Sequence, residues 1–341
     1  MTAPSNRLNT IFTSLEAAGF PRDLQRLLLP DWVTPEVLSD ETASAEVATI
    51  IAKRLGLRPT SLFSRTPQIE AMRRRDTKYK RSIPNRSKDL TAATAIAVGV
   101  AETIAAACRV PFSPVPSDAK SLRQALLKDF PGYWLGLRNL LMYCWARGVP
   151  VVHLAEIGQG VAKMDGMVVQ TNERPVIVLS KNAELWAWQL FVLAHELAHI
   201  ALGHVEPDEI LIDEELGKDS YAMDDPDLDE RAADSFAIEL LNGRPDATYR
   251  VSTEQVNAPT LAQAAFDHGK PQKIDPGHIV LNFAHRSGNW PIGVAAAKLL
   301  QGNQPAAAVV INEAMWRELA PDAFSDDTLE FLHRAIGTSV G

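Results

Sequence analysis

The chain has 341 residues, of which 46% are apolar and 22% are charged, and its formal net charge is −8. This composition is ordinary for a globular protein with room for two or three domains, and the acidic balance argues against a general nucleic-acid binder. The two cysteines, Cys108 and Cys144, lie far apart in apolar patterns. That placement argues against a disulfide framework or a cysteine zinc site and fits a reducing cytoplasm.

The first residues, MTAPSNRLNT, show no charged-then-apolar signal sequence. The longest apolar run, 90–107, contains Gly99 and Glu102. We therefore interpret it as a buried core helix rather than a membrane span, and expect a cytoplasmic protein with no membrane partner.

Residues 1–66 predict a helical domain. Within it, AEVATIIAKRLGLRPTSLF (45–63) predicts a helix, a turn at Gly56 and a second helix beginning near Pro59. This rhythm is found in helix-turn-helix DNA-binding motifs, but any two helices joined at a glycine share it.

Residues 73–88, RRRDTKYKRSIPNRSK, form a basic segment with eight Lys or Arg and one Asp. They lie in a predicted linker-and-helix region, 67–118, and the plain interpretation is a solvated linker. The alternative is a nucleic-acid contact, with cations on phosphates and Tyr79 stacked on a base. The candidate contacts are Arg73, Arg74, Arg75, Lys78, Lys80 and Arg81.

Beyond the proline-rich stretch 110–118, the pattern changes from helical to mixed. A long helix with Asn182 as its N-cap and Gly203 at its end follows three strands, the last two joined at Asn172-Glu173. The sequence thus predicts an α+β fold, a mostly helical chain with a small three-stranded sheet packed on this helix. The predicted strands are 149–157, 166–171 and 174–180, and the long helix is 183–203. The predicted domains here are an α+β domain over 119–244 and a helical region over 245–341.

Residues 205–229 form an acidic segment with eleven Asp or Glu and one Lys. We expect a mobile, poorly packed loop near the site, because its charges repel and it offers little apolar area. The basic segment can fold back on it, although this attraction is screened beyond about 8 Å at physiological salt. The apolar residues available to anchor it are Ile210, Leu211, Ile212 and Leu216.

The long helix carries the sequence HELAH. His195 and His199 are four residues apart, so both imidazoles leave one face of the helix and can share a Zn²⁺ ion. Glu196 is offset by about 100° and is placed to act on a water rather than on the metal. This is the H-E-x-x-H pattern, in which the glutamate is a general base.

A catalytic zinc needs a third protein ligand and one open position. His204 is a poor candidate, because it lies about 180° around from His195 if the helix continues. Glu230 and Asp234 are four apart on one face of the predicted helix 230–241. We favour Glu230 as the ligand to one zinc per chain and Asp234 as a hydrogen-bond partner of a ligand histidine; the alternative is that both only solvate their helix.

These motifs resemble the ImmA/IrrE family of zinc metallo-endopeptidases. The similar stretches are CWARGVPVVHL, RPVIVLSKNAELWAWQLFVLAHELAHIALGH and ERAADSFAIELL, and the resemblance is closest over about 119–241. It implies a zincin-like domain with zinc on His195, His199 and Glu230 and with Glu196 as the base. Two departures, LLNG in place of LLMP and Ala198 in place of a glycine, involve no ligand.

The resemblance implies cleavage of a helix-turn-helix repressor, in stress, phage or mobile-element regulation. We expect strand 174–180 to bind the substrate backbone by strand addition. The residue that stabilises the oxyanion is left open, with Tyr221 and His153 as candidates. Single-stranded DNA on the basic segment is a candidate activator. The competing classes are a DNA-binding regulator with a structural or degenerate zinc site and an inhibitor-binding module without turnover.

Overall fold

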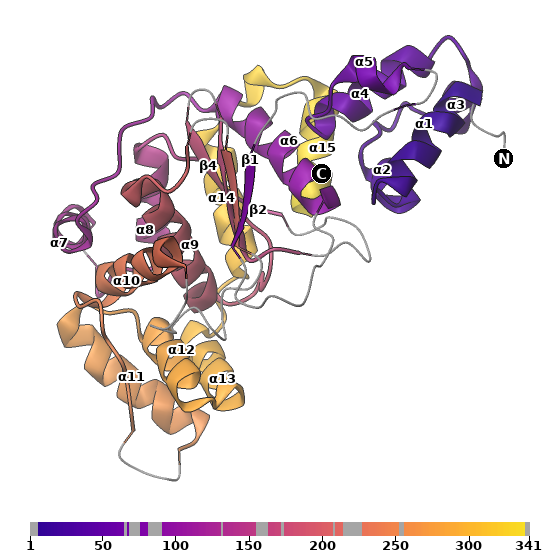
Figure 1. Cartoon of the computed structure of the whole chain (residues 1–341). Coiled ribbons are helices and arrows are strands. Elements are labelled where there is room, and N and C mark those ends of the chain that lie inside the picture. The colour runs from indigo at the N-terminus through magenta and orange to yellow at the C-terminus, as the bar shows by residue number, and fades with distance from the viewer. Residues whose placement is uncertain are drawn as a thin grey trace.

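The fold places one small sheet between two groups of helices (Figure 1). The computed structural model describes residues 6–64, 67, 76–80, 91–130, 132–154, 163–171, 174–206, 209–213, 227–251 and 256–337. The strands are β1 (Asp76–Lys80), β2 (Val151–His153), β3 (Gly166–Gln170), β4 (Pro175–Leu179) and β5 (Glu209–Asp213).

The sheet has the order β1-β5-β3-β4-β2. The predicted hairpin is confirmed, since β3 and β4 are antiparallel with Gln170 opposite Pro175, while β2 pairs parallel to β4. The prediction of three strands was too low by two. Strand 174–180 cannot add a substrate strand as expected, because β4 is paired on both of its sides.

The expectation of a loop throughout 205–229 was wrong at β5. Ile210, Leu211 and Ile212 are at most 5% exposed, and β5 lies between β1 and β3. The acidic residues of this strand are at its two ends, so their repulsion does not prevent burial of its apolar centre. The basic segment supplies β1, whose Lys78 and Lys80 stand opposite Leu211 and Asp213 in a parallel register. Residues 207–208 and 214–226 lie outside the described part of the chain.

Alternate residues of the strands face two different helical layers, as the period of two in a strand requires. Val168, Ile177 and Leu179 belong to the core shared with α8 (Leu137–Ala146) and α9 (Trp186–Leu202). Val169 and Val176, on the opposite face, belong to the core shared with α6 (Thr91–Ala107). Within the apolar run 90–107, residues 91–107 form a core helix, as predicted. Among the described residues, no helix combines the length and apolarity needed to cross a membrane.

A group of short helices begins the chain. The expected helix and Gly56 turn are present, but the second helix, α5, has only four residues and is about 6 Å long. The helices are α1 (Asn6–Ala17), α2 (Arg22–Leu27), α3 (Pro35–Ser39), α4 (Ser44–Arg54) and α5 (Pro59–Leu62).

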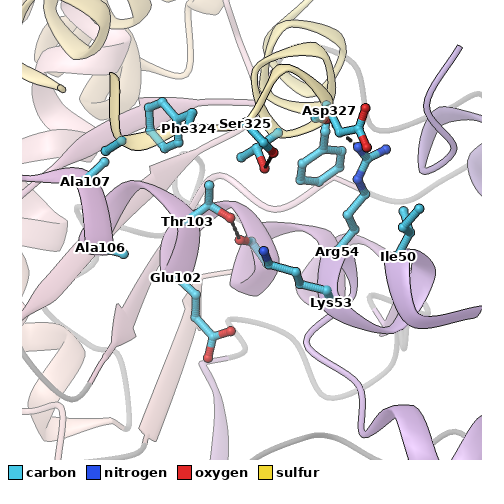
Figure 2. Close-up of a pocket in the computed structure, with 14 residues that line it drawn as sticks. Ile50, Lys53, Arg54, Glu102, Thr103, Ala106, Ala107, Phe324, Ser325 and Asp327 are labelled. Carbon is cyan, nitrogen blue, oxygen red and sulfur yellow. Dashed lines mark hydrogen bonds between the residues drawn. The ribbon is translucent and has the colours of Figure 1, made fainter. Parts of the chain in front are cut away.

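The last helix, α15 (Asp326–Ile336), returns to this N-terminal group. The Arg54 guanidinium donates to the carbonyl oxygens of Leu28, at 2.6 Å, and Asp327. Its charge is buried, which lowers its pKa to about 10. Beside it, a cavity of about 490 Å³ separates α4, α6 and α15, with Lys53, Glu102 and Thr103 on its wall (Figure 2).

The C-terminal region divides into two parts. Helices α11, α12 and α13 form a core of their own, away from the sheet (Figure 1). In contrast, α14 covers the edge strand β2, where the Asn312 amide accepts from the His153 backbone N–H and donates to its carbonyl oxygen, both at 2.9 Å. The remaining helices are α7 (Ala119–Asp129), α10 (Leu228–Asn242), α11 (Ala258–Gln272), α12 (Pro276–Ser287), α13 (Trp290–Gln301), α14 (Ala307–Glu318) and the 3₁₀ turn Pro321–Ala323.

Candidate metal centre

Helix α9 carries the HELAH sequence through the middle of the molecule. It packs on β3 and β4 with one side and on α10 with another. Its side chains are mostly Leu, Phe, Val and Ala, which explains why it is buried, and His195, Glu196 and His199 have no exposed surface at all. The helix begins at Trp186, so Asn182 is not its N-cap; Asn182 instead adopts a positive φ of 51° in the preceding turn.

Helix α10 brings the predicted carboxylates to the histidines. Its N-cap is Asp227, whose side chain accepts the Asp229 backbone N–H, and this start places Glu230 in the first turn facing α9. Nε2 of His195 lies 2.9 Å from Nε2 of His199 and 3.3 Å from Oε2 of Glu230. Nε2 of His199 lies 3.5 Å from Oε1 of Glu230.

These three groups fit a zinc ion. Ligand atoms held about 2.0–2.1 Å from a tetrahedral zinc lie about 3.3 Å from one another, close to the 2.9–3.5 Å separations here. Two imidazoles and a carboxylate also make up a known ligand set for catalytic zinc. The sequence predicted all three residues, and together they form a His-His-Glu cluster able to hold a metal.

Asp234 contacts the first histidine from the side opposite the cluster. Its Oδ1 lies 2.8 Å from Nδ1 of His195 and accepts the ring N–H, as the sequence predicted. An imidazole that donates through Nδ1 has its Nε2 lone pair directed to the metal. The carboxylate therefore sets which nitrogen of His195 faces the cluster.

Glu196 lies against the start of β3, where one residue has no side chain. A Cβ atom placed on Gly166 would be 1.9 Å from Oε1 of Glu196 and 2.7 Å from its Cδ. Glycine is thus the residue that leaves room for this carboxyl group. Sequence reasoning missed Gly166, because a glycine at the start of a strand carries no signal that identifies its neighbour across the fold.

The other sequence candidates have mixed outcomes. His204 is not part of the cluster of three, but its Nδ1 lies 2.9 Å from Nδ1 of His199. His153 is fully buried, its Nε2 is 3.3 Å from the Lys181 carbonyl oxygen, and burial lowers its pKa to about 4. Tyr221 lies outside the described residues.

The candidate nucleic-acid contacts belong to the basic segment, of which the structure describes the backbone of residues 76–80. Lys78 and Lys80 are on β1, at the far edge of the sheet. The other four lie outside the described residues: Arg73, Arg74, Arg75 and Arg81.

The two departures from the resembling family have local explanations. Ala198 is fully buried in α9. In LLNG, Asn242 donates from its amide to Nε2 of His278 at 2.8 Å, and Gly243 ends α10 with a φ of 81°.

Comparison with known families agrees with this geometry. Residues 152–258 match the Peptidase M78 family model, described as an IrrE N-terminal-like domain. No curated protein and no solved structure matches the chain significantly. The resemblance to the ImmA/IrrE family is thereby confirmed, and this region is a metallopeptidase domain of that kind. All three cluster residues, together with Glu196 and Asp234, fall within it.

Proposed function

We propose that the protein is a zinc-dependent endopeptidase with one zinc per chain and a helix-turn-helix repressor as its substrate. The observation that carries this proposal is the convergence of His195, His199 and Glu230 inside the region that matches a peptidase family. Glu196 occupies the same buried helix and supplies the base that peptide hydrolysis requires.

The roles follow from position. His195, His199 and Glu230 hold the ion. Zinc, when bound, supplies Lewis acidity that makes a water more acidic and polarises a peptide carbonyl. Glu196 takes a proton from the attacking water at its carboxylate and returns it to the leaving amine. Asp234 holds the His195 ring in the orientation that directs Nε2 toward the centre.

The substrate class rests on the family resemblance, and the proposed activator rests on charge. A helix-turn-helix repressor is the substrate that the ImmA/IrrE resemblance implies. The basic segment has a local charge of +7, from eight cations and one anion, which suits single-stranded DNA. Its strand β1 lies beside β5 of the acidic segment, which supports the prediction that the two segments meet. DNA bound there would compete with the acidic segment and raise cleavage.

The decisive experiment measures metal and cleavage together. Purified protein should contain about one zinc per chain by elemental analysis and should cleave a repressor encoded beside it. The His195→Ala variant should lose both, whereas His268→Ala, an exposed histidine on α11, should lose neither. A wild-type chain without transition metal would refute the proposal. Zinc that is bound without any cleavage would favour a regulator with a structural site.

A second arm tests the DNA proposal. Cleavage by the wild type should rise when a single-stranded oligonucleotide is added and should depend on salt. A variant with the six named cations of the basic segment neutralised should lose this response. If basal cleavage, salt dependence and DNA response are all unchanged, the segment is only a linker.

A further inference from the structure

We propose that His204 is a positioning residue for the metal centre, with Asp229 behind it. The inference rests on the proposed function, because it concerns how the second zinc ligand is held. Nδ1 of His204 lies 2.9 Å from Nδ1 of His199, and Nε2 of His204 lies 3.8 Å from Oδ1 of Asp229. The result is a line of three side chains that ends at a carboxylate.

The end of α9 creates this contact. Gly203 takes the left-handed conformation, with φ 72°, and ends the helix. The chain turns back, and the His204 backbone N–H donates to the His199 carbonyl oxygen at 2.9 Å. In a continuing helix, residue 204 would lie about 140° around from residue 199 and its ring would point away. The left-handed cap is therefore what places the His204 ring against that of His199.

The role of His199 as a metal ligand determines which ring nitrogens of His199 and His204 carry hydrogen. Nε2 of His199 faces the cluster and must offer its lone pair there, so Nδ1 carries the hydrogen and donates it. Nδ1 of His204 must then be the acceptor. A neutral His204 keeps its own hydrogen on Nε2, on the side of Asp229. The sequence thus gives each ligand histidine its own acceptor, Asp234 for His195 and His204 for His199.

Burial increases the importance of Nδ1 of His204 as a hydrogen-bond acceptor. The His199 ring is fully buried, and the side chain of His204 is only 11% exposed, so water has little access to replace the acceptor. A buried donor that loses its partner is costly, and outer partners of ligand histidines typically contribute 10–100-fold to metal affinity. We expect a loss in that range when the acceptor at position 204 is removed.

A matched pair of variants separates the acceptor from the space that it fills. His204→Leu keeps much of the volume but offers no acceptor, whereas His204→Gln offers a carbonyl oxygen. Zinc dissociation constants are measured by competition with a chromophoric chelator, and the ligand field is measured from the absorption of the cobalt-substituted protein. His268→Ala serves as the control histidine, and thermal melting of each metal-free protein checks the fold.

The expected result is zinc binding weakened about 10–100-fold in His204→Leu and largely restored in His204→Gln, with a cobalt spectrum altered only in the former. Metal-free melting temperatures should match that of the wild type. If His204→Leu does not fold, His204→Ala replaces it in the comparison.

Two outcomes overturn the inference while leaving the metal centre in place. One is wild-type zinc affinity in the leucine variant, and the other is a glutamine variant that binds no better than the leucine variant. A wild-type protein that binds no zinc refutes the centre itself, and the inference with it.

Discussion

The tight contact between Gly166 and Glu196 gives the sharpest single-residue prediction. Alanine at position 166 would place Cβ 1.9 Å from Oε1, 2.7 Å from Cδ and 2.9 Å from Cγ of Glu196. Ordinary contact needs about 3.5 Å, so the carboxyl group must move by about 1.5 Å. Glu196 is fully buried, and the strand carrying Gly166 is paired on both sides, so neither partner moves freely.

The magnitude follows from this displacement. A catalytic group misplaced by about 1 Å can cost about 100-fold in rate, and added volume in a packed core costs about 1–3 kcal/mol of stability. We therefore expect kcat/KM of Gly166→Ala to fall by about 100-fold or more while the zinc content stays at that of the wild type. Zinc should remain because the three atoms nearest to the new Cβ all belong to Glu196 and none to a ligand.

The assay is cleavage of the substrate repressor by metal-loaded protein, with elemental analysis and a thermal melt on the same samples. Gly132→Ala is the matched control, because a Cβ there meets its nearest neighbour at 3.7 Å. Wild-type cleavage by Gly166→Ala would show that Glu196 has room to move and that its position beside β3 is not needed. Loss of zinc together with activity would show that the glycine supports the ligands instead.

Three further predictions concern the buried polar residues. Glu196→Gln should keep its zinc and lose about 10²–10⁴-fold in hydrolysis, because it removes a base and not a ligand; cleavage at the wild-type rate would assign the proton transfer elsewhere. Asp234→Asn should raise the zinc dissociation constant about 10-fold or more, measured by competition with a chelator. An unchanged constant would show that the 2.8 Å hydrogen bond from His195 to Asp234 does not contribute to zinc binding. Burial lowers the pKa of His278 to about 3. Below about pH 6.5 the unfolded chain therefore takes up a proton that the folded chain does not, and the free energy of unfolding decreases as the pH is lowered. When the pH is lowered from 7 to 5, the free energy of unfolding measured in urea should decrease by about 2 kcal/mol less in the metal-free His278→Gln variant than in the metal-free wild type. Equal decreases in the two proteins would contradict this.

The meeting of His195, His199 and Glu230 was predictable because most of the information for it is local. The spacing of His195 and His199 fixes their shared face on any helix, and the spacing of Glu230 and Asp234 fixes theirs. Only the meeting of the two helices is tertiary, and it is favoured because α9 is largely apolar and α10 has a buried apolar face. His204 is not part of this cluster, as the sequence predicted, and its ring reaches that of His199 because Gly203 ends the helix in the left-handed conformation.

The strand β5 was hidden by its surroundings. Taken as a whole, the 25-residue acidic segment has a net charge of −10, which predicts a loop. Within it, however, Ile210, Leu211 and Ile212 form an uncharged apolar run. Its partner β1 is more than a hundred residues away and consists mostly of polar residues. No periodicity within either segment shows that they pair, because the pairing depends on the sheet edge that β3 already offers.

The sheet also shows how the catalytic region depends on distant parts of the chain. The family match covers residues 152–258, but its strands also depend on helices outside this range. One face of the strands packs on α6, and the Asn312 side chain of α14 makes two hydrogen bonds to the backbone of the edge strand β2. A fragment limited to 119–244 would expose Val169 and Val176 to water and leave the β2 edge unpaired, an arrangement that favours aggregation. The predicted domain 119–244 therefore contains His195, His199 and Glu230, but we infer that the part of the chain able to fold independently also includes α6 and α14.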